Sequence, residues 1–386
     1  MMKKYLSVLI IGAGAIGRGY APWLFEDFDH KLTFADANEE LVEKLLKVKS
    51  FSSFMTKFEG YKELVVSNFD VQHIYEIEDT LESFDLIITA VGPRNFLSLS
   101  QLLQQTSTPI WCFENDRSLV DKMKSLIGRD NVYFGIPDVI ASNEHSAHGL
   151  DIKNGLGLIT EDGPTFIETH PYHIGSHVKH VSEDEIRKQW AAKLYIHNTP
   201  HCVAAYLGSL ANVNYIHEAL QIPEVETLVT SVASEMSQMV QRTFNIEEEF
   251  CEFYLKKEIK RFKNKLLFDP ISRVAREPLR KLELNGRLLG AASLAIEAQI
   301  MPTNTLIGIH AAMHYDNESD PDYQMQVLLK SLDPKEFLSK VLGLDPQNIL
   351  FELLVKRWPE HDIISERLRA KVKNRDTRSN ARFKVS

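Results

Sequence analysis

The chain has 386 residues, more than one ordinary hydrophobic core holds, so two or three domains are expected. Hydrophobic residues make up 44 % and charged residues 25 %, which is typical of a globular protein and excludes a largely disordered chain. The net charge of −9 at pH 7 argues against nucleic acid as a partner, and no apolar run approaches the roughly 20 residues of a membrane helix. Three distant cysteines and a start without a secretion signal lead us to expect a cytoplasmic protein.

The first half of the sequence alternates short apolar runs with helical patterns. Residues 5–11 form an apolar run that ends at Gly12 and suits a strand buried on both faces. Such alternation needs crossover connections and predicts a parallel sheet covered by helices on both faces, as in a Rossmann-type α/β domain. Further strands are expected at 31–36, 85–91, 109–114 and 132–134, and helices from the glycine turn to Leu24, at 39–48 and at 119–127.

The pattern changes after residue 150. Glycines and prolines separate two short stretches, 156–160 and 165–169, which we interpret as a small antiparallel β extension. Helical periodicity then dominates from residue 183, as in 225–244 and 250–262. The sequence therefore predicts a Rossmann-type domain over 1–182 and an all-helical, substrate-binding domain over 183–386.

The last twenty residues, 367–386, carry eight Lys or Arg against one acid, Asp376. A basic tail of this kind can bind nucleic acid or a membrane surface. We favour a solvated helix end that frays into a flexible terminus, because chain ends are often poorly ordered.

A dinucleotide site is predicted at the first glycine turn. Gly12, Gly14 and Gly17 follow a strand and open a helix, where they permit the tight turn, the approach of backbone to a pyrophosphate and close helix–strand packing. Asp36 ends the second strand, where a carboxylate accepts hydrogen bonds from the ribose and repels the 2′-phosphate of NADP, so NAD is the expected cofactor. The expected cofactor-binding residues are Gly12, Gly14, Ala15, Ile16, Gly17, Asp36, Val91, Gly92 and Asn115.

A candidate catalytic group lies in the stretch 193–201. Pro200 cannot continue a helix, and Asn198 or Thr199 can cap a new one, so we expect a bent helix pair whose elbow gathers Lys193, Asn198 and His201. A lysine buried near bound NAD⁺ has a lowered pKa and can act as a base on an alcohol. A nearby asparagine amide can donate to the developing alkoxide.

These segments together resemble the polyol-specific long-chain dehydrogenases and reductases. The signature Lys-x4-Asn-x2-His stands here as Lys193, Asn198 and His201, and the cofactor segment of the family matches residues 12–19 and 34–36. Further matches run in consistent order through Thr89–Pro93, Glu114–Asn115, Arg273–Leu282 and Ala311–His314.

The resemblance implies an activity and residue roles. It is strongest to members that interconvert mannitol 1-phosphate and fructose 6-phosphate with NAD, and these are often monomers. It implies that Lys193 is the general base in oxidation and the acid in reduction, that Asn115 and Asn198 hold the alkoxide, and that His201 binds a substrate hydroxyl. Arg273 and Lys281 match positions that contact substrate.

The sequence itself supports a phosphorylated substrate. Residues 273–287 hold five cations, Arg273, Arg276, Arg280, Lys281 and Arg287, against two glutamates. Guanidinium groups suit a phosphomonoester, which carries nearly two negative charges. We expect Arg276 and Arg280, four residues apart on one helical face, to bind the phosphate.

One segment departs from the family. Relatives commonly carry an Asp-Arg pair where this chain has Asp138 and Val139, which leaves the substrate open. A hexitol or hexuronate oxidoreductase and a non-catalytic NAD-binding sensor remain alternatives. A metal-dependent enzyme is a further one, since six histidines lie within 145–180 and His173 and His177 are four apart. We expect no metal, because no cysteine pair or nearby acid completes a ligand set there and a lysine base needs none.

Overall fold

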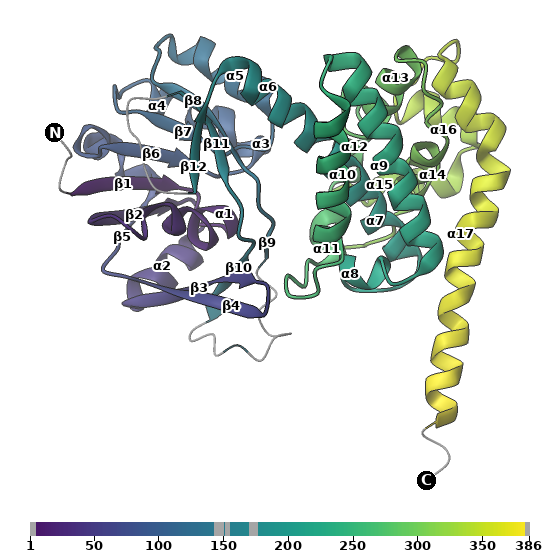
Figure 1. The fold of residues 1–386 in the computed structure, drawn as a ribbon, viewed down its shortest axis with the longest axis horizontal. Coiled ribbons are helices and arrows are strands. Elements are labelled where there is room, and N and C mark those ends of the chain that lie inside the picture. Colours follow the sequence, from purple (N-terminus) through teal and green to yellow (C-terminus); the bar gives the residue numbers. More distant parts are fainter. Residues whose placement is uncertain (1–4, 143–149, 151–154, 170–176, 383–386) are drawn as a thin grey trace. The chain divides into compact units, whose positions relative to one another are not determined.

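The computed structural model describes residues 5–142, 150, 155–169 and 177–382, and for residues beyond 370 only the backbone. The chain divides into two compact units, Met1–Trp190 and Ala191–Ser386 (Figure 1). The division falls one helix later than the expected boundary at 182/183. Among the described residues, no helix is long and apolar enough to cross a membrane.

The first unit contains an eight-stranded sheet and a four-stranded sheet. The order of the larger one is β12-β11-β8-β7-β6-β1-β2-β5, and its pairs from β8 to β5 are all parallel. This confirms the predicted Rossmann-type α/β architecture. The strands are β1 (Leu6–Ile11), β2 (His30–Asp36), β3 (Ser50–Lys57), β4 (Gly60–Ser67), β5 (Asp70–His73), β6 (Leu86–Thr89), β7 (Ile110–Cys112), β8 (Val132–Pro137), β9 (Ala141–Ser142), β10 (Leu158–Thr160), β11 (Thr165–Glu168) and β12 (Val178–Val181).

Both faces of the large sheet are covered, which explains why its strands are apolar throughout. In β1, Val8 and Ile10 belong to a core that includes Tyr20 and Phe25, whereas Leu9 and Ile11 belong to a second core with Val120 and Met123. Successive side chains of a strand point to opposite faces, so a strand between two helical layers has no polar side. The helices are α1 (Ala15–Gly19), the 3-10 helix η1 (Ala21–Phe25), α2 (Glu39–Lys47), α3 (Pro93–Phe96), α4 (Ser100–Leu103), α5 (Arg117–Ile127) and α6 (Glu183–Ala191).

The β extension is antiparallel in part, as expected, but its two strands belong to different sheets and each also has a parallel neighbour. β11 pairs antiparallel with β8 and parallel with β12, whereas β10 joins the smaller sheet, parallel to β3 and antiparallel to β9. That smaller sheet is built on the hairpin of β3 and β4, which the sequence analysis did not predict. The expected helix up to Leu24 is also divided, because Gly19 ends α1 and a 3-10 helix follows.

The second unit is all-helical, as predicted. Its central helix α7 is buried on almost every side, and α9 and α14 pack against it. Gly308 of α14 permits a close crossing, because a Cβ there would collide with Val203 of α7. The helices are η7 (Ala192–Asn198), α7 (Thr199–Leu210), α8 (Ile216–Ala219), α9 (Pro223–Phe244), α10 (Glu248–Phe262), α11 (Ile271–Ala275), α12 (Pro278–Lys281), α13 (Leu289–Glu297), α14 (Thr303–Met313), α15 (Gln324–Ser331), α16 (Pro334–Lys340) and α17 (Ile349–Arg382).

The basic tail is more helical than its composition predicts. α17 continues to Arg382, so most of the stretch we expected to fray belongs to a helix. Figure 1 shows this helix in yellow, extending away from the other helices of its unit.

Candidate active site

The glycine turn of the first unit has the geometry that a dinucleotide requires. Gly12 has φ +98° and a Cβ there would lie 2.5 Å from the Ala90 carbonyl oxygen, so no other residue fits. A Cβ on Gly17 would collide with the Gly12 carbonyl oxygen. Gly14 is different, because a Cβ there would meet no atom within 4 Å. The space beside Gly14 is therefore open to a ligand, which fits the approach of a pyrophosphate to the backbone.

Asp36 connects the glycine turn to the end of β2. Its carboxylate accepts hydrogen bonds from the backbone N–H of Ala13 (2.7 Å) and of Asn38 (2.8 Å). Each oxygen retains a lone pair, because an ionised carboxylate offers about four acceptor sites. The half-buried side chain can therefore hold the turn and still accept hydrogen bonds from ribose hydroxyls.

A second carboxylate, which matched the family pattern but received no role from the sequence, organises the neighbouring loop. Glu114 is buried after β7 and accepts hydrogen bonds from the N–H groups of Val91 (3.0 Å) and Gly92 (2.9 Å). Burial raises the pKa of this carboxyl group. In the sequence, Glu114 could be noticed only as an acid directly after a buried strand. Carboxylates that hold a loop and carboxylates that bind a ligand both occur at this position.

These loops border a pocket of about 840 Å³ within the first unit. The pocket lies at the carboxyl ends of β1, β2 and β6, where open parallel sheets bind their ligands. Asn115 is not one of its lining residues; its Oδ1 is buried and has no hydrogen-bond partner among the described residues. The lining residues are Gly12, Gly14, Asp36, Ala37, Ile74, Tyr75, Glu78, Ala90, Val91, Asn95, Ser98, Leu99, Gln101, Leu102 and Gln105.

Val139 packs in the core of the first unit. It is buried, and its Cγ1 is so close to Gly163 that a Cβ on that glycine would lie 2.9 Å away. The backbone N–H of the preceding Asp138 donates to the Pro164 carbonyl oxygen at 2.9 Å. The apolar side chain of Val139 is therefore accommodated by core packing.

The second unit presents Lys193, His197 and Asn198 on a π-helix, η7. The helix runs without a break from α6 through η7 into α7, so the two separate helices that we expected on either side of this segment are one. Pro200 lies in the first turn of α7, where its missing N–H costs little, and Asn198 makes no side-chain cap. π-helical segments occur often at functional sites.

Asn198 and His201 have the side-chain environments of binding residues. The Asn198 amide is buried, and its Nδ2 has no hydrogen-bond partner among the described residues, so a donor is available. His201 Nε2 lies 2.9 Å from Oδ2 of the buried Asp269, and its ring stacks on Phe262 with centroids 4.9 Å apart. The carboxylate and the stacked ring fix the orientation of the imidazole.

Asp269 was not predicted, yet it joins two predicted residues. Its second oxygen, Oδ1, accepts from Nε of Arg273 at 2.9 Å and from Nη2 at 2.5 Å. Nearby ions and hydrogen bonds lower the pKa of Asp269 despite its burial, chiefly through Arg273. The sequence signal, an acid four residues before an arginine, is too common to single out.

Arg276 and Arg280 do not share a helical face. α11 ends at Ala275 and α12 begins at Pro278, and between them Glu277 has φ +59°. Both arginines instead contact the buried Glu277 carboxylate, Arg276 Nη2 at 3.3 Å and Arg280 Nε at 3.1 Å. The helix break explains the error, since Pro278 excludes a helical Glu277 before it.

Lys281 is the most buried cation of the basic segment. Only 3 % of the residue is exposed, its Nζ donates to the Arg276 carbonyl oxygen, and the ammonium lies 5.8 Å from the Tyr206 ring centroid. Burial, together with the neighbouring charge of Arg287, lowers its pKa to about 7. Near neutral pH the protonation state of Lys281 is therefore sensitive to the charges around it.

The histidine-rich stretch supports no metal site in the part that the structure describes. His145, His148, His170 and His173 lie outside the described residues. His177 is described, and its Nε2 lies 3.6 Å from Glu26 Oε1. The proposed pair of His173 and His177 thus stays an untested alternative.

Comparison with known proteins identifies the family. The Mannitol dehydrogenase Rossmann domain matches residues 6–109, and the Mannitol dehydrogenase C-terminal domain matches residues 185–335. Mannitol-1-phosphate 5-dehydrogenase of Thermoanaerobacter pseudethanolicus is 30 % identical over 382 residues, covering 92 % of this chain and 98 % of the relative. The enzyme of the same name from Caldanaerobacter subterraneus is 27 % identical over 380 residues, with the same coverage of both chains.

Solved structures agree on the fold. The chain resembles Pseudomonas fluorescens mannitol 2-dehydrogenase in a ternary complex with NAD and D-mannitol, with a TM-score of 0.69, 13 % identity and coverage of 100 % of this chain and 95 % of the other. A substrate-free D-sorbitol dehydrogenase gives a TM-score of 0.67 at 14 % identity, covering 94 % and 97 %. The chain therefore belongs to the mannitol dehydrogenase family and is an NAD-dependent polyol dehydrogenase.

Proposed function

We propose that the enzyme interconverts mannitol 1-phosphate and fructose 6-phosphate, with Lys193 as the group that exchanges the proton. The observation that carries the substrate assignment is the basic segment 273–287, in which buried Lys281 lies among arginines of the helical unit. A neutral hexitol gives such a cluster no counter-charge, whereas a phosphomonoester does. The names of the relatives support the same substrate.

The proton chemistry is assigned to residues of η7 and α7. The cofactor, when bound, would supply the hydride acceptor as NAD⁺ and the hydride donor as NADH. When the alcohol is oxidised, neutral Lys193 takes the hydroxyl proton as the hydride leaves the same carbon; when the ketone is reduced, the ammonium returns it. The amide donor of Asn198, which has no hydrogen-bond partner among the described residues, stabilises the alkoxide.

His201 and Arg273 are assigned to substrate binding. Nε2 of His201 lies 2.9 Å from Oδ2 of Asp269, and a proton on Nε2, favoured by this carboxylate, leaves Nδ1 to accept from a substrate hydroxyl. Arg273 is held through Nε and Nη2, so its remaining amino group is available for substrate. Arg276, Arg280 and Lys281 are proposed to bind the phosphate.

Binding a phosphate beside the Glu277 carboxylate is electrostatically unfavourable. Glu277 already contacts both arginines, and a phosphate must share them with this buried carboxylate. Lys281 supplies the balancing charge, because an approaching dianion favours its protonated form.

The test compares NADH oxidation with fructose 6-phosphate, fructose and tagaturonate. We expect fructose 6-phosphate to give the highest kcat/KM, and Arg280→Ala to raise the KM for it at least tenfold while leaving that for fructose within twofold. Preference for fructose contradicts the phosphate assignment and favours a hexitol dehydrogenase. Preference for tagaturonate favours a hexuronate oxidoreductase.

A further inference from the structure

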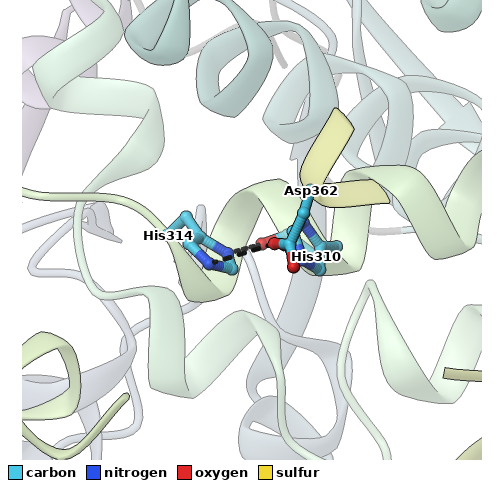
Figure 2. Close-up of side chains that lie close together, drawn as sticks. All are labelled: His310, His314 and Asp362. Atoms are coloured by element: carbon cyan, nitrogen blue, oxygen red, sulfur yellow. Dashed lines mark hydrogen bonds and ion pairs between the residues drawn. The ribbon is translucent and has the colours of Figure 1, made fainter. Parts of the chain in front are cut away.

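The helical unit contains a second group of polar side chains, apart from the candidate active site. His310 and His314 are one turn apart on α14, and Asp362 approaches them from α17 (Figure 2). His310 Nε2 lies 3.1 Å from Asp362 Oδ1, and His314 Nε2 lies 3.9 Å from the same oxygen. One nitrogen of each ring and one carboxylate oxygen all lie within 4.8 Å of one another.

His310 is buried without a hydrogen-bond partner. Only 1 % of its side chain is exposed, and neither ring nitrogen has such a partner among the described residues; the contact with Asp362 is close but lacks hydrogen-bond geometry. A buried polar group in this state is unfavourable unless something satisfies it. Its Nε2 is directed at the carboxylate of Asp362, where a cation would supply the missing interaction.

His314 is oriented in the way that metal-binding histidines are. Its Nδ1 lies 2.9 Å from the carbonyl oxygen of His310, and a proton on Nδ1 leaves the lone pair on Nε2, the atom that faces Asp362. Histidines that bind metal usually donate their second nitrogen to a carbonyl or carboxylate. Burial lowers the pKa of both histidines, so both rings are neutral at pH 7 and available as ligands.

We propose that His310, His314 and Asp362 bind one divalent transition metal of the Zn²⁺ class. Two imidazoles and one carboxylate suit zinc, whereas Mg²⁺ and Ca²⁺ prefer oxygen ligands alone. In a tetrahedral zinc site with ligand distances of about 2.1 Å the ligand atoms lie roughly 3.4 Å apart, so shifts of about 1 Å suffice. Asp362 is 46 % exposed, which leaves room for water as the fourth ligand.

The ion links two helices, α14 and α17. α14 packs on α7, which carries His201, while α17 supplies the acid at a point just after Pro359. None of the three ligands is among the residues assigned to hydride or proton transfer. The ion therefore stabilises the helical unit, and the lysine-based chemistry does not depend on it.

The test uses the full chain after treatment with a chelator. Calorimetric titration with Zn²⁺ is expected to give one site per chain, Co²⁺ to give the visible absorption of a tetrahedral complex, and Zn²⁺ at 100 times its Kd to raise Tm by about 5 °C. Asp362→Asn and His314→Gln should each weaken binding at least tenfold and lower the increase in Tm at the same Zn²⁺ concentration to about half or less.

Two matched variants control for charge and for the loss of a buried histidine. Glu366→Gln removes an exposed acid one turn further along α17, and His361→Gln removes a neighbouring buried imidazole. Both should bind Zn²⁺ as the wild type does. Absence of saturable binding of Zn²⁺ and Co²⁺ overturns the proposal, as does equal binding by wild type and Asp362→Asn, which would place the ion on other histidines. Neither result affects the proposed dehydrogenase reaction, which is measured separately by NADH oxidation.

Discussion

Asp269→Asn is the substitution that most directly tests how the substrate-binding residues are held. The carboxylate is 4 % exposed; its Oδ2 lies 2.9 Å from Nε2 of His201, and its Oδ1 accepts from Arg273. An amide of the same shape retains one acceptor, so one of the two partners then faces an NH2 group. A hydrogen bond to a charged group contributes about 1.5–3 kcal/mol. A loss near 2 kcal/mol corresponds to about a 30-fold lower kcat/KM for fructose 6-phosphate.

The assay is steady-state NADH oxidation at saturating NADH, with thermal unfolding followed in parallel. Glu235→Gln is a matched control, because this buried carboxylate also accepts several hydrogen bonds, from Asn304 and Thr305, but contacts no predicted site residue. We expect both variants to lose stability and only Asp269→Asn to lose activity. A folded Asp269→Asn enzyme whose kcat/KM stays within threefold of wild type would refute the proposed positioning role.

Substitutions at three further residues have expected outcomes. Lys193→Ala should lower kcat by about 10²–10⁴-fold while the Kd for NADH, measured by fluorescence titration, stays within twofold; a mutant that keeps most of its rate places the base elsewhere. Asp36→Ala should raise the ratio of kcat/KM with NADPH to that with NADH at least tenfold, and an unchanged ratio contradicts its role. Lys281 has a pKa near 7, so the KM for fructose 6-phosphate should rise between pH 7 and 9, where the phosphate is already a dianion, and Lys281→Arg should flatten this profile. In the unfolded state a lysine keeps its proton to about pH 10.5, so between pH 7 and 10.5 the unfolded state binds more protons than the folded state. The contribution of Lys281 to the free energy of unfolding therefore rises over this range. Thermal unfolding of the wild type and of Lys281→Met, compared across these pH values, can detect the rise.

The sequence predicts the large sheet well because burial on both faces leaves an unmistakable pattern. β1, β2, β6 and β7 are apolar almost throughout, and each was expected within a few residues. The β3–β4 hairpin was missed because its strands carry serines, lysines and a glutamate between the apolar residues, and β4 is mostly exposed. A half-exposed hairpin resembles a polar loop when only one sequence is read.

The candidate site was predictable where a backbone requirement restricts the residue type. Only glycine fits at Gly12, and its role was therefore inferred correctly. Asp269 was not found and Glu114 was given no role, since a buried carboxylate that positions a loop or an imidazole looks like any surface acid until the fold brings its partners together. The pairing of Arg276 and Arg280 with Glu277 depends on a left-handed residue between two short helices, which helical spacing does not reveal.

The π-helix explains how a motif with five-residue spacing works within one helix. In an α-helix, five residues turn about 500°, which leaves Lys193 and Asn198 about 140° apart, and His197 would share the face of Lys193 instead. The turn of a π-helix is wider, about 4.4 residues, so in η7 Lys193 and Asn198 lie roughly 50° apart, and the α-helical step of three residues then returns His201 to within about 10° of Lys193. His197, one residue before Asn198, is buried against the carboxylate of Glu258, which Arg261 also contacts. The wider helical turn thus brings Asn198, whose amide is left available to a substrate, nearer to the face of Lys193 and His201.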